Sequence, residues 1–167
     1  YAWVIDQMGF EQTAYYAINI HGGKANRSEQ LINVIRSLPA NVRNRLTLEN
    51  DEKCYNVTDL LSIHRATKCP IVLDTHHWSF DPSDMGLDQA INETLGTWGK
   101  IKPLQHLSNT EIGMENAPYN KKRAHSQYIH YIPEKQLELI KSDIADVEAK
   151  AKNLAIFKMR EDFNVEV

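Results

Sequence analysis

The sequence predicts an α/β fold of the TIM-barrel type, in which about five (β/α) units form an incomplete barrel. Runs of β-type residues alternate with amphipathic helical segments, a pattern typical of a mostly parallel sheet with right-handed crossovers. The β-type runs begin roughly 26 to 40 residues apart, which is the length of one βαβ unit. A complete barrel needs eight units and about 250 residues, whereas this chain has 167 residues. We therefore expect residues 1–167 to form a single domain that is the C-terminal portion of a (β/α)8 barrel.

Five runs rich in β-branched and other apolar residues are expected to be strands. The first run ends at Gly22 and Gly23, the third reads as a fully buried strand, and Pro103 weakens the fourth. The expected strands are 15–21, 45–50, 71–76, 102–107 and 143–148. We expect these strands to be parallel and to lie side by side in chain order.

Helical segments are expected where apolar residues recur at three- and four-residue spacing between the strands. Asn26 and Glu29 have the spacing of a capping box before the first helix, and Asn56 is expected to cap the second. Asp84 precedes the clearest apolar stripe, and Pro133 opens a short helix. The expected apolar faces lie within 31–38, 60–66, 87–95, 134–140 and 150–159.

The composition excludes several classes of protein. Hydrophobic residues make up 42% and charged residues 25% of the chain, as in soluble globular proteins. No apolar run approaches the roughly 20 residues of a membrane helix, and the first residues do not resemble a signal peptide, so no membrane association is expected. The two cysteines suit a reducing compartment. We expect a cytoplasmic protein of a bacterium, archaeon or phage, or a nuclear protein of a fungus.

The net charge and the absence of two sequence motifs exclude further classes of function. The net charge of -3 argues against a protein that simply coats nucleic acid, although a protein of this charge can still bind phosphates through metal ions. The glycine fingerprints of Rossmann and P-loop proteins do not occur in the sequence. Dinucleotide-binding and P-loop functions are therefore not expected.

Ligand-type side chains occur where the expected strands end, and one more follows in the loop after the fourth strand. In a barrel, the carboxyl ends of all strands lie on one face, which holds the active site. Imidazole and carboxylate groups are accepted ligands of Mn²⁺, Zn²⁺ and Fe²⁺, and two or more such ions can clamp a phosphoryl displacement. No cysteine joins the set, which argues against a structural thiolate zinc site. The candidate metal ligands are His21, Glu49, Asp74, His77, His106, His125 and Glu148.

Each candidate also has a simpler structural interpretation. A single histidine at a strand end more often packs or forms a hydrogen bond, and Glu148 could belong to a solvated charged face. Glu49 is a stronger candidate because its strand is otherwise apolar, and a buried carboxylate needs a partner. His64 and His130 are expected to be surface or packing residues, and His76 at most supports a ligand.

Six sequence blocks resemble the UV damage endonuclease family (UvdE/UvsE type), in the order of that family and at about its spacing. The blocks are IHGG at 20–23, RLTLEND at 45–51, CPIVLDTHHW at 69–78, HLS at 106–108, RAHSQYI at 123–129 and VEAKAK at 147–152. Each block alone is weak, but six in order are fairly specific. The resemblance covers essentially the whole chain from Tyr15 onward.

The resemblance implies a TIM-barrel enzyme that nicks the DNA backbone immediately 5′ to UV photoproducts with two or three divalent ions, commonly Mn²⁺. It implies that all seven candidate ligands bind metal and that Glu49, Asp74 and His106 are catalytic, with Glu49 as a bridging carboxylate. Damaged double-stranded DNA is the implied partner. Among the cationic side chains, Lys121, Lys122 and Arg123 are the best candidates to contact the DNA.

This chain differs from the family pattern in two ways. The family often has a lysine two residues before the histidine of the HLS block, and that lysine can be modified to a metal-bridging carbamate; Leu104 occupies this position here. The N-terminal strands of the family, with further histidine ligands and the residues that probe the lesion, would lie before Tyr1.

Two other interpretations remain open at the level of the sequence. Endonuclease IV-like AP endonucleases and xylose isomerase-like sugar isomerases also place Glu, Asp and His at strand ends. Alternatively, the chain is an inactive truncated remnant. An incomplete barrel has open strand edges, so a homodimer that covers them is a further expectation.

Overall fold

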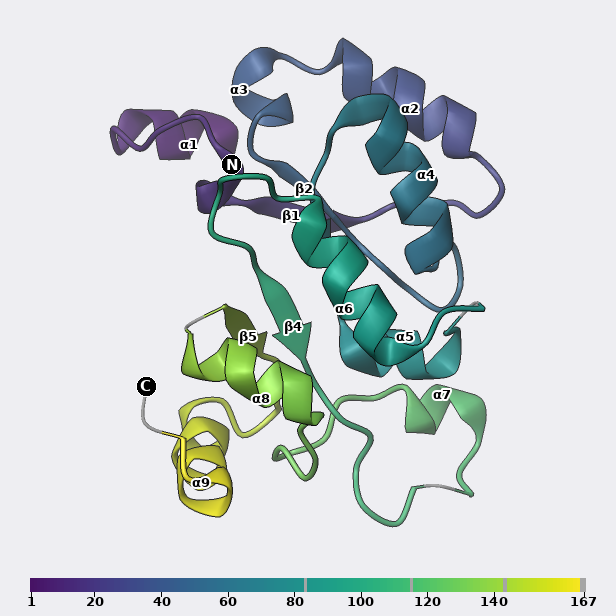
Figure 1. The fold of residues 1–167 in the computed structure, drawn as a ribbon, viewed down its shortest axis with the longest axis vertical. Helices are drawn as coiled ribbons and strands as arrows, with labels where there is room; N and C mark the ends of the chain where they lie inside the picture. The colour runs from purple at the N-terminus through teal and green to yellow at the C-terminus, as the bar shows by residue number, and fades with distance from the viewer. Residues whose placement is uncertain (83, 115, 143, 166–167) are drawn as a thin grey trace.

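The computed structural model describes residues 1–82, 84–114, 116–142 and 144–165 (Figure 1). Its strands are β1 (Ile18–His21), β2 (Leu46–Glu49), β3 (Ile71–Val72), β4 (Gln105–Leu107) and β5 (Ala145–Val147). The first three form a parallel sheet in the order β1-β2-β3, and β4 pairs in parallel with β5. A parallel bridge between Asp74 and His106 joins the two sheets, with the His106 amide donating to the Leu73 carbonyl at 2.9 Å. The predicted parallel order along the chain is confirmed.

Helices connect successive strands, which confirms an α/β fold of (β/α) units. The helices are α1 (Ala2–Gln7), the 3-10 helix η1 (Ala14–Tyr16), α2 (Ser28–Ser37), α3 (Ala40–Arg43), α4 (Val57–Thr67), α5 (Thr75–Phe80), α6 (Leu87–Gly96), α7 (Tyr119–Lys122), α8 (Glu134–Lys141) and α9 (Asn153–Phe163). In Figure 1, α2, α4 and α6 lie together beside the first sheet, and α8 lies beside β4 and β5. In the part of the chain that the structure describes, no helix has the length and apolar character that crossing a membrane requires.

Of the two helix caps predicted from the sequence, one is correct and one is wrong. The predicted cap of α4 by Asn56 is confirmed, since its side chain accepts from the Asp59 amide at 3.1 Å. The Asp59 side chain also accepts from the Asn56 amide at 3.3 Å, which completes a capping box that was not predicted. The capping box predicted for α2 is wrong, because Arg27 occupies the cap position and Asn26 is turned into the left-handed region with φ 57°. The spacing of Asn26 and Glu29 was therefore coincidental.

Several predicted strand boundaries need correction, and the fourth strand, predicted over 102–107, starts only at Gln105. The third strand was predicted over 71–76 but ends at Val72, because the Asp74 side chain caps α5 and turns the chain into a helix. The first strand starts later than residue 15, since η1 occupies the residues before it. In the fifth strand, residue 143 lies outside the described residues, and pairing runs over Ala145–Val147.

Two apolar clusters hold the helices on the sheet. Leu48, Ile71 and Leu73 point outward and pack, fully buried, with side chains of α4 and α6 such as Leu60 and Ile91. A second cluster joins β4 and β5 to α8 and α9. Full burial of such a side chain stabilises the fold by about 1.5–3 kcal/mol.

The alternation of side chains along β2 determines where polar groups face. Because Leu46 and Leu48 face the helices, Thr47 and Glu49 face the opposite, inner side of the sheet. Thr47 donates there to Asn19 on β1 at 2.9 Å. A small apolar layer of Ala14, Val72 and Trp98, with Leu104 packed on it, is also buried. The inner face therefore carries polar groups that continue to the carboxyl ends of the strands.

Candidate metal centre

Glu49 ends β2 and lies at the middle of the cluster of ligand-type residues. Its side chain is only 6% exposed. One carboxylate oxygen accepts from Asn19 Nδ2 at 2.6 Å, and the other lies 3.1 Å from His106 Nδ1. His21 is the register partner of Glu49 on β1, and its Nε2 lies 3.9 Å from the carboxylate. The pairing of β1 with β2, together with the bridge between Asp74 and His106, thus brings residues of β1, β2 and β4 together.

His106 lies between two carboxylates. Its Nδ1 is 3.1 Å from Glu49 and 3.0 Å from Glu148, whose second oxygen is 3.3 Å from His125 Nδ1. Burial lowers the pKa of His106, but the hydrogen bonds to Glu148 and Glu49 outweigh it and raise that pKa to about 10. The hydrogen bond from His106 in turn lowers the pKa of Glu148. In the metal-free protein, an imidazolium therefore provides the positive charge that these carboxylates need.

Asp74 is a fully buried carboxylate at the end of β3. One oxygen accepts from the amides of His76 and His77 at 2.7 and 3.0 Å, and the other lies 3.4 Å from Ser108 Oγ. The Asn50 side chain bonds the amide and the carbonyl of Asp74 at 2.8 and 3.1 Å. These bonds fix the carboxylate without using all of its acceptor capacity.

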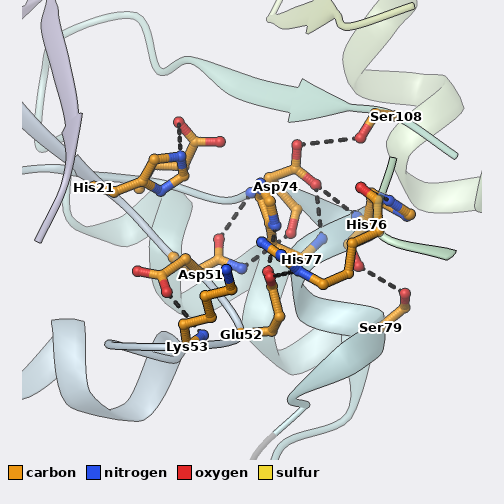
Figure 2. Close-up of polar contacts among 12 residues, drawn as sticks. His21, Asp51, Glu52, Lys53, Asp74, His76, His77, Ser79 and Ser108 are labelled. Atoms are coloured by element: carbon orange, nitrogen blue, oxygen red, sulfur yellow. Dashed lines mark hydrogen bonds and ion pairs between the residues drawn. The ribbon is translucent and has the colours of Figure 1, made fainter. Parts of the chain in front are cut away.

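His77 lies in the first turn of α5, where the capped helix turns its ring toward the cluster. Its ring centroid is 5.3 Å from that of His21 and 6.1 Å from that of His125. Its Nδ1 lies 2.6 Å from Oε2 of Glu52, and Figure 2 shows the Glu52 side chain directed at this ring. His77 therefore has one ring nitrogen held by a carboxylate and the other left for a ligand.

Two groups of residues within the described part of the chain offer ligand atoms that all lie within 4.8 Å of one another. The groups are His21, Glu49 and His77, and Glu49, Asp74 and His106. Glu49 belongs to both groups, as a carboxylate that bridges two cations would. The donors are imidazole nitrogens and carboxylate oxygens, so the site fits a divalent transition metal. The structure thus brings five of the seven predicted ligands into two overlapping sets, with Glu148 and His125 adjoining through His106.

Other predicted residues lie around this cluster. Arg123 directs its guanidinium at Glu52, with which its Nε forms an ion pair, and lies 5.8 Å from the centre of the Tyr119 ring. Lys121 is exposed and Lys122 half-buried on α7. His76 is buried, with Nε2 3.2 Å from the Arg123 carbonyl, and burial is the main cause that lowers its pKa.

The two histidines expected to be structural have partners outside the cluster. His64 Nδ1 lies 2.9 Å from the Cys69 carbonyl, and His130 Nε2 lies 3.3 Å from Glu111. Leu104, at the position of the family lysine, packs on the apolar layer of Val72 and Trp98. Leucine has no amine, so Leu104 cannot form a carbamate bridge.

Sequence reasoning missed several polar residues that support the ligands, among them Asn50, which bonds the backbone of Asp74. Asn19 binds Glu49, and Glu52, whose side chain is fully buried, binds His77 and Arg123. A signal existed for Glu52, since it follows Glu49 and Asp51 in the loop directly after β2. Nothing local distinguishes Asn19 from a solvent-exposed amide.

Comparisons with known proteins agree on one family. The family model of the UV-endonuclease UvdE matches residues 1–166. A UV DNA damage endonuclease of a Nostoc species is 36% identical over 171 residues, covering 96% of this chain and 49% of the relative. The corresponding protein of Deinococcus radiodurans is 34% identical, with 96% and 52% covered. The crystal structure of SacUVDE superimposes with a TM-score of 0.78 at 26% identity, covering 99% of this chain and 56% of that one. The chain therefore spans about half the length of its curated relatives, and it belongs to the UV-endonuclease UvdE family.

Proposed function

We propose that this chain carries the metal centre of a DNA repair endonuclease that hydrolyses the phosphodiester backbone 5′ to UV photoproducts in double-stranded DNA. Two or three divalent cations, Mn²⁺ in particular, would be held by His21, Glu49, Asp74, His77, His106, His125 and Glu148. The observation that carries the proposal is the position of Glu49 in both ligand groups. Family membership favours DNA over the small polyols of a sugar isomerase.

The residues of the chain itself prepare this chemistry. When bound, divalent cations supply an activated water nucleophile and neutralise charge on the phosphate. Asn19 fixes one Glu49 oxygen, and the α5 amides with Asn50 fix Asp74, so the carboxylates are positioned before any cation arrives. The hydrogen bonds to Glu148 and Glu49 raise the pKa of His106 to about 10, so His106 would have to lose this proton to bind a cation through the same nitrogen. In the metal-free protein, the positive charge of His106 would thus balance the carboxylates, as a bound cation would.

Cationic side chains near the site would contact the DNA backbone. We propose Lys121, Lys122 and Arg123 for this role, and the ion pair of Arg123 with Glu52 makes the two lysines the more accessible of the three. Each phosphate contact contributes about -0.9 to the slope of log affinity against log salt concentration. Loss of a contact in Lys121→Ala should reduce that slope by about this amount, and an unchanged slope would remove the residue from the interface.

Nicking of supercoiled plasmid tests the proposed activity. The protein is incubated with Mn²⁺ and either UV-irradiated or unirradiated plasmid, with a chelator as control. We expect relaxed circles from the irradiated plasmid alone, and an end-labelled oligonucleotide with one pyrimidine dimer should be cut on its 5′ side. Equal nicking of both plasmids contradicts lesion recognition, and cutting only of abasic DNA indicates the AP endonuclease alternative. Absence of nicking together with tight Mn²⁺ binding would favour the inactive remnant.

The expected homodimer rests on open strand edges. Among the described strands, β1 and β5 each pair on one side only. Unpaired edges favour association with another strand, so we propose that two copies associate through them. Sedimentation equilibrium should then give twice the mass of 19.2 kDa. A monomer at all concentrations would contradict the proposal.

A further inference from the structure

Glu52 has surroundings that the proposed metal chemistry leaves unexplained. Its side chain is fully buried although it lies in the loop between β2 and α4. Its two oxygens have different partners. Oε2 lies 2.6 Å from Nδ1 of His77 (Figure 2), and Oε1 forms an ion pair with Nε of Arg123. A buried carboxylate is costly unless it is paired and hydrogen-bonded, so both partners are needed to keep Glu52 inside.

Side-chain hydrogen bonds hold the loop on both sides of Glu52. Before it, the Asn50 side chain bonds both backbone groups of Asp74 at 2.8 and 3.1 Å, which ties the end of β2 to the end of β3. Around it, the Asp51 side chain accepts from the amides of Lys53 and Cys54 at 2.8 and 2.7 Å. These bonds hold the loop so that the buried carboxylate of Glu52 lies beside the first turn of α5.

His77 is the residue through which Glu52 would act. Together with His21 and Glu49 it forms one of the groups whose ligand atoms lie within 4.8 Å. A carboxylate that accepts from Nδ1 keeps the proton on that nitrogen, fixes the plane of the ring and leaves the lone pair of Nε2 free. Carboxylates placed in this way also make a histidine a better metal ligand.

We propose that Glu52 is a positioning residue that fixes the tautomer and the ring orientation of His77, so that Nε2 of His77 binds the cation shared with His21 and Glu49. This inference rests on the proposed metal centre and deepens it. Arg123 has a supporting part, since it neutralises the oxygen of Glu52 that His77 does not use.

Metal titration of three proteins tests the inference. Mn²⁺ is titrated calorimetrically into wild type, Glu52→Gln and the matched control Glu111→Gln, which removes a carboxylate from another histidine pair, that of His130. We expect Glu52→Gln to weaken Mn²⁺ binding about 10- to 100-fold, and Glu111→Gln to bind as wild type does. Glu52→Asp, which keeps the charge, should recover part of the lost affinity. Equal affinity in Glu52→Gln and wild type, or an equal loss in Glu111→Gln, would overturn the inference.

A second measurement needs no variant and covers the case in which Glu52→Gln does not fold. In wild type loaded with Zn²⁺, which is diamagnetic, ¹⁵N chemical shifts of the histidine rings identify the metal-bound nitrogen. We expect His77 to bind through Nε2 and to retain its proton on Nδ1. Binding through Nδ1 would overturn the inference while leaving the metal centre itself intact. Failure of wild type to bind either metal would overturn the proposed centre and the inference together.

Discussion

Replacing Glu49 by Gln should remove the carboxylate that we propose as the metal bridge, while keeping the size of the side chain. Gln retains one neutral acceptor oxygen but loses the negative charge and the second anionic oxygen, so it cannot hold two cations close together. We expect Glu49→Gln to lose metal-dependent nicking to the background level and to lose most of the thermal stabilisation that Mn²⁺ gives to wild type. Stabilisation by a ligand follows its affinity, and 100-fold excess over the dissociation constant corresponds to about 2.7 kcal/mol.

The effect on the metal-free protein can be estimated from the contacts of Glu49. Its oxygens lie 2.6 Å from Asn19 Nδ2 and 3.1 Å from the His106 imidazolium. A hydrogen bond to a charged group contributes about 1.5–3 kcal/mol, and Glu148 remains as a second partner of His106. We expect a loss of about 1–3 kcal/mol, which for a chain of this size lowers the melting temperature by about 2–10 °C. Relief of like-charge repulsion with Asp74 would have the opposite sign, and we expect the loss of the bonds to Asn19 and His106 to outweigh it.

Thermal melts with and without Mn²⁺ separate these two effects. Wild type, Glu49→Gln and the control Glu111→Gln are compared at the same protein and metal concentrations. The account requires a lower metal-free melting temperature and a smaller Mn²⁺-induced shift in Glu49→Gln alone. A higher metal-free melting temperature combined with the full Mn²⁺ shift would refute the assignment of Glu49 as a ligand and as the partner of His106.

Three further predictions concern the metal-free protein. The pKa of His106 is raised to about 10 from an unfolded value of about 6.5, so its contribution to stability is complete below pH 6.5 and is lost as the pH rises through 10. The difference in unfolding free energy between wild type and His106→Gln should shrink over this interval, and a constant difference would contradict the ion pairs. A Cβ on Gly22 would lie 2.2 Å from the ring of the buried Tyr55, so Gly22→Ala should cost about 1–3 kcal/mol in urea denaturation; a neutral result would mean that the ring is free to move. Burial raises the pKa of the Cys69 thiol to about 12, so a thiol reagent at pH 8 should modify the half-buried Cys54 in the native protein and Cys69 only after unfolding, whereas rapid modification of both would contradict the burial of Cys69.

Strand order and the ligand face followed from the sequence because both depend on local patterns. Apolar runs at βα spacing predict parallel neighbours, and parallel neighbours place their carboxyl ends at one edge. The observed register pairs His21 with Glu49, one residue before the predicted end of the second strand. The sequence pattern did not predict where β3 ends. A carboxylate such as that of Asp74 can act as a metal ligand, as a helix cap or as both, and only its bonds to the α5 amides show that it caps the helix.

The supporting role of Glu52 was harder to predict than the strand order, for a different reason. Glu52 looks like a loop carboxylate in the sequence, and its burial depends on His77 and Arg123, which are distant in the chain. Asn26 and Glu29 illustrate the reverse case, since they match a capping pattern that the conformation of Asn26 does not allow. Local patterns thus identify groups of a suitable chemical type, whereas tertiary contacts determine which of them are positioned to act.

Anomalous diffraction from crystals saturated with Mn²⁺ tests the central claim most directly. The account predicts anomalous peaks at two positions that share Glu49, one beside His21 and His77 and the other beside Asp74 and His106. Peaks confined to other surfaces of the molecule, or no peak beside Glu49 at saturating Mn²⁺, would contradict the assignment of these strand ends as a metal centre.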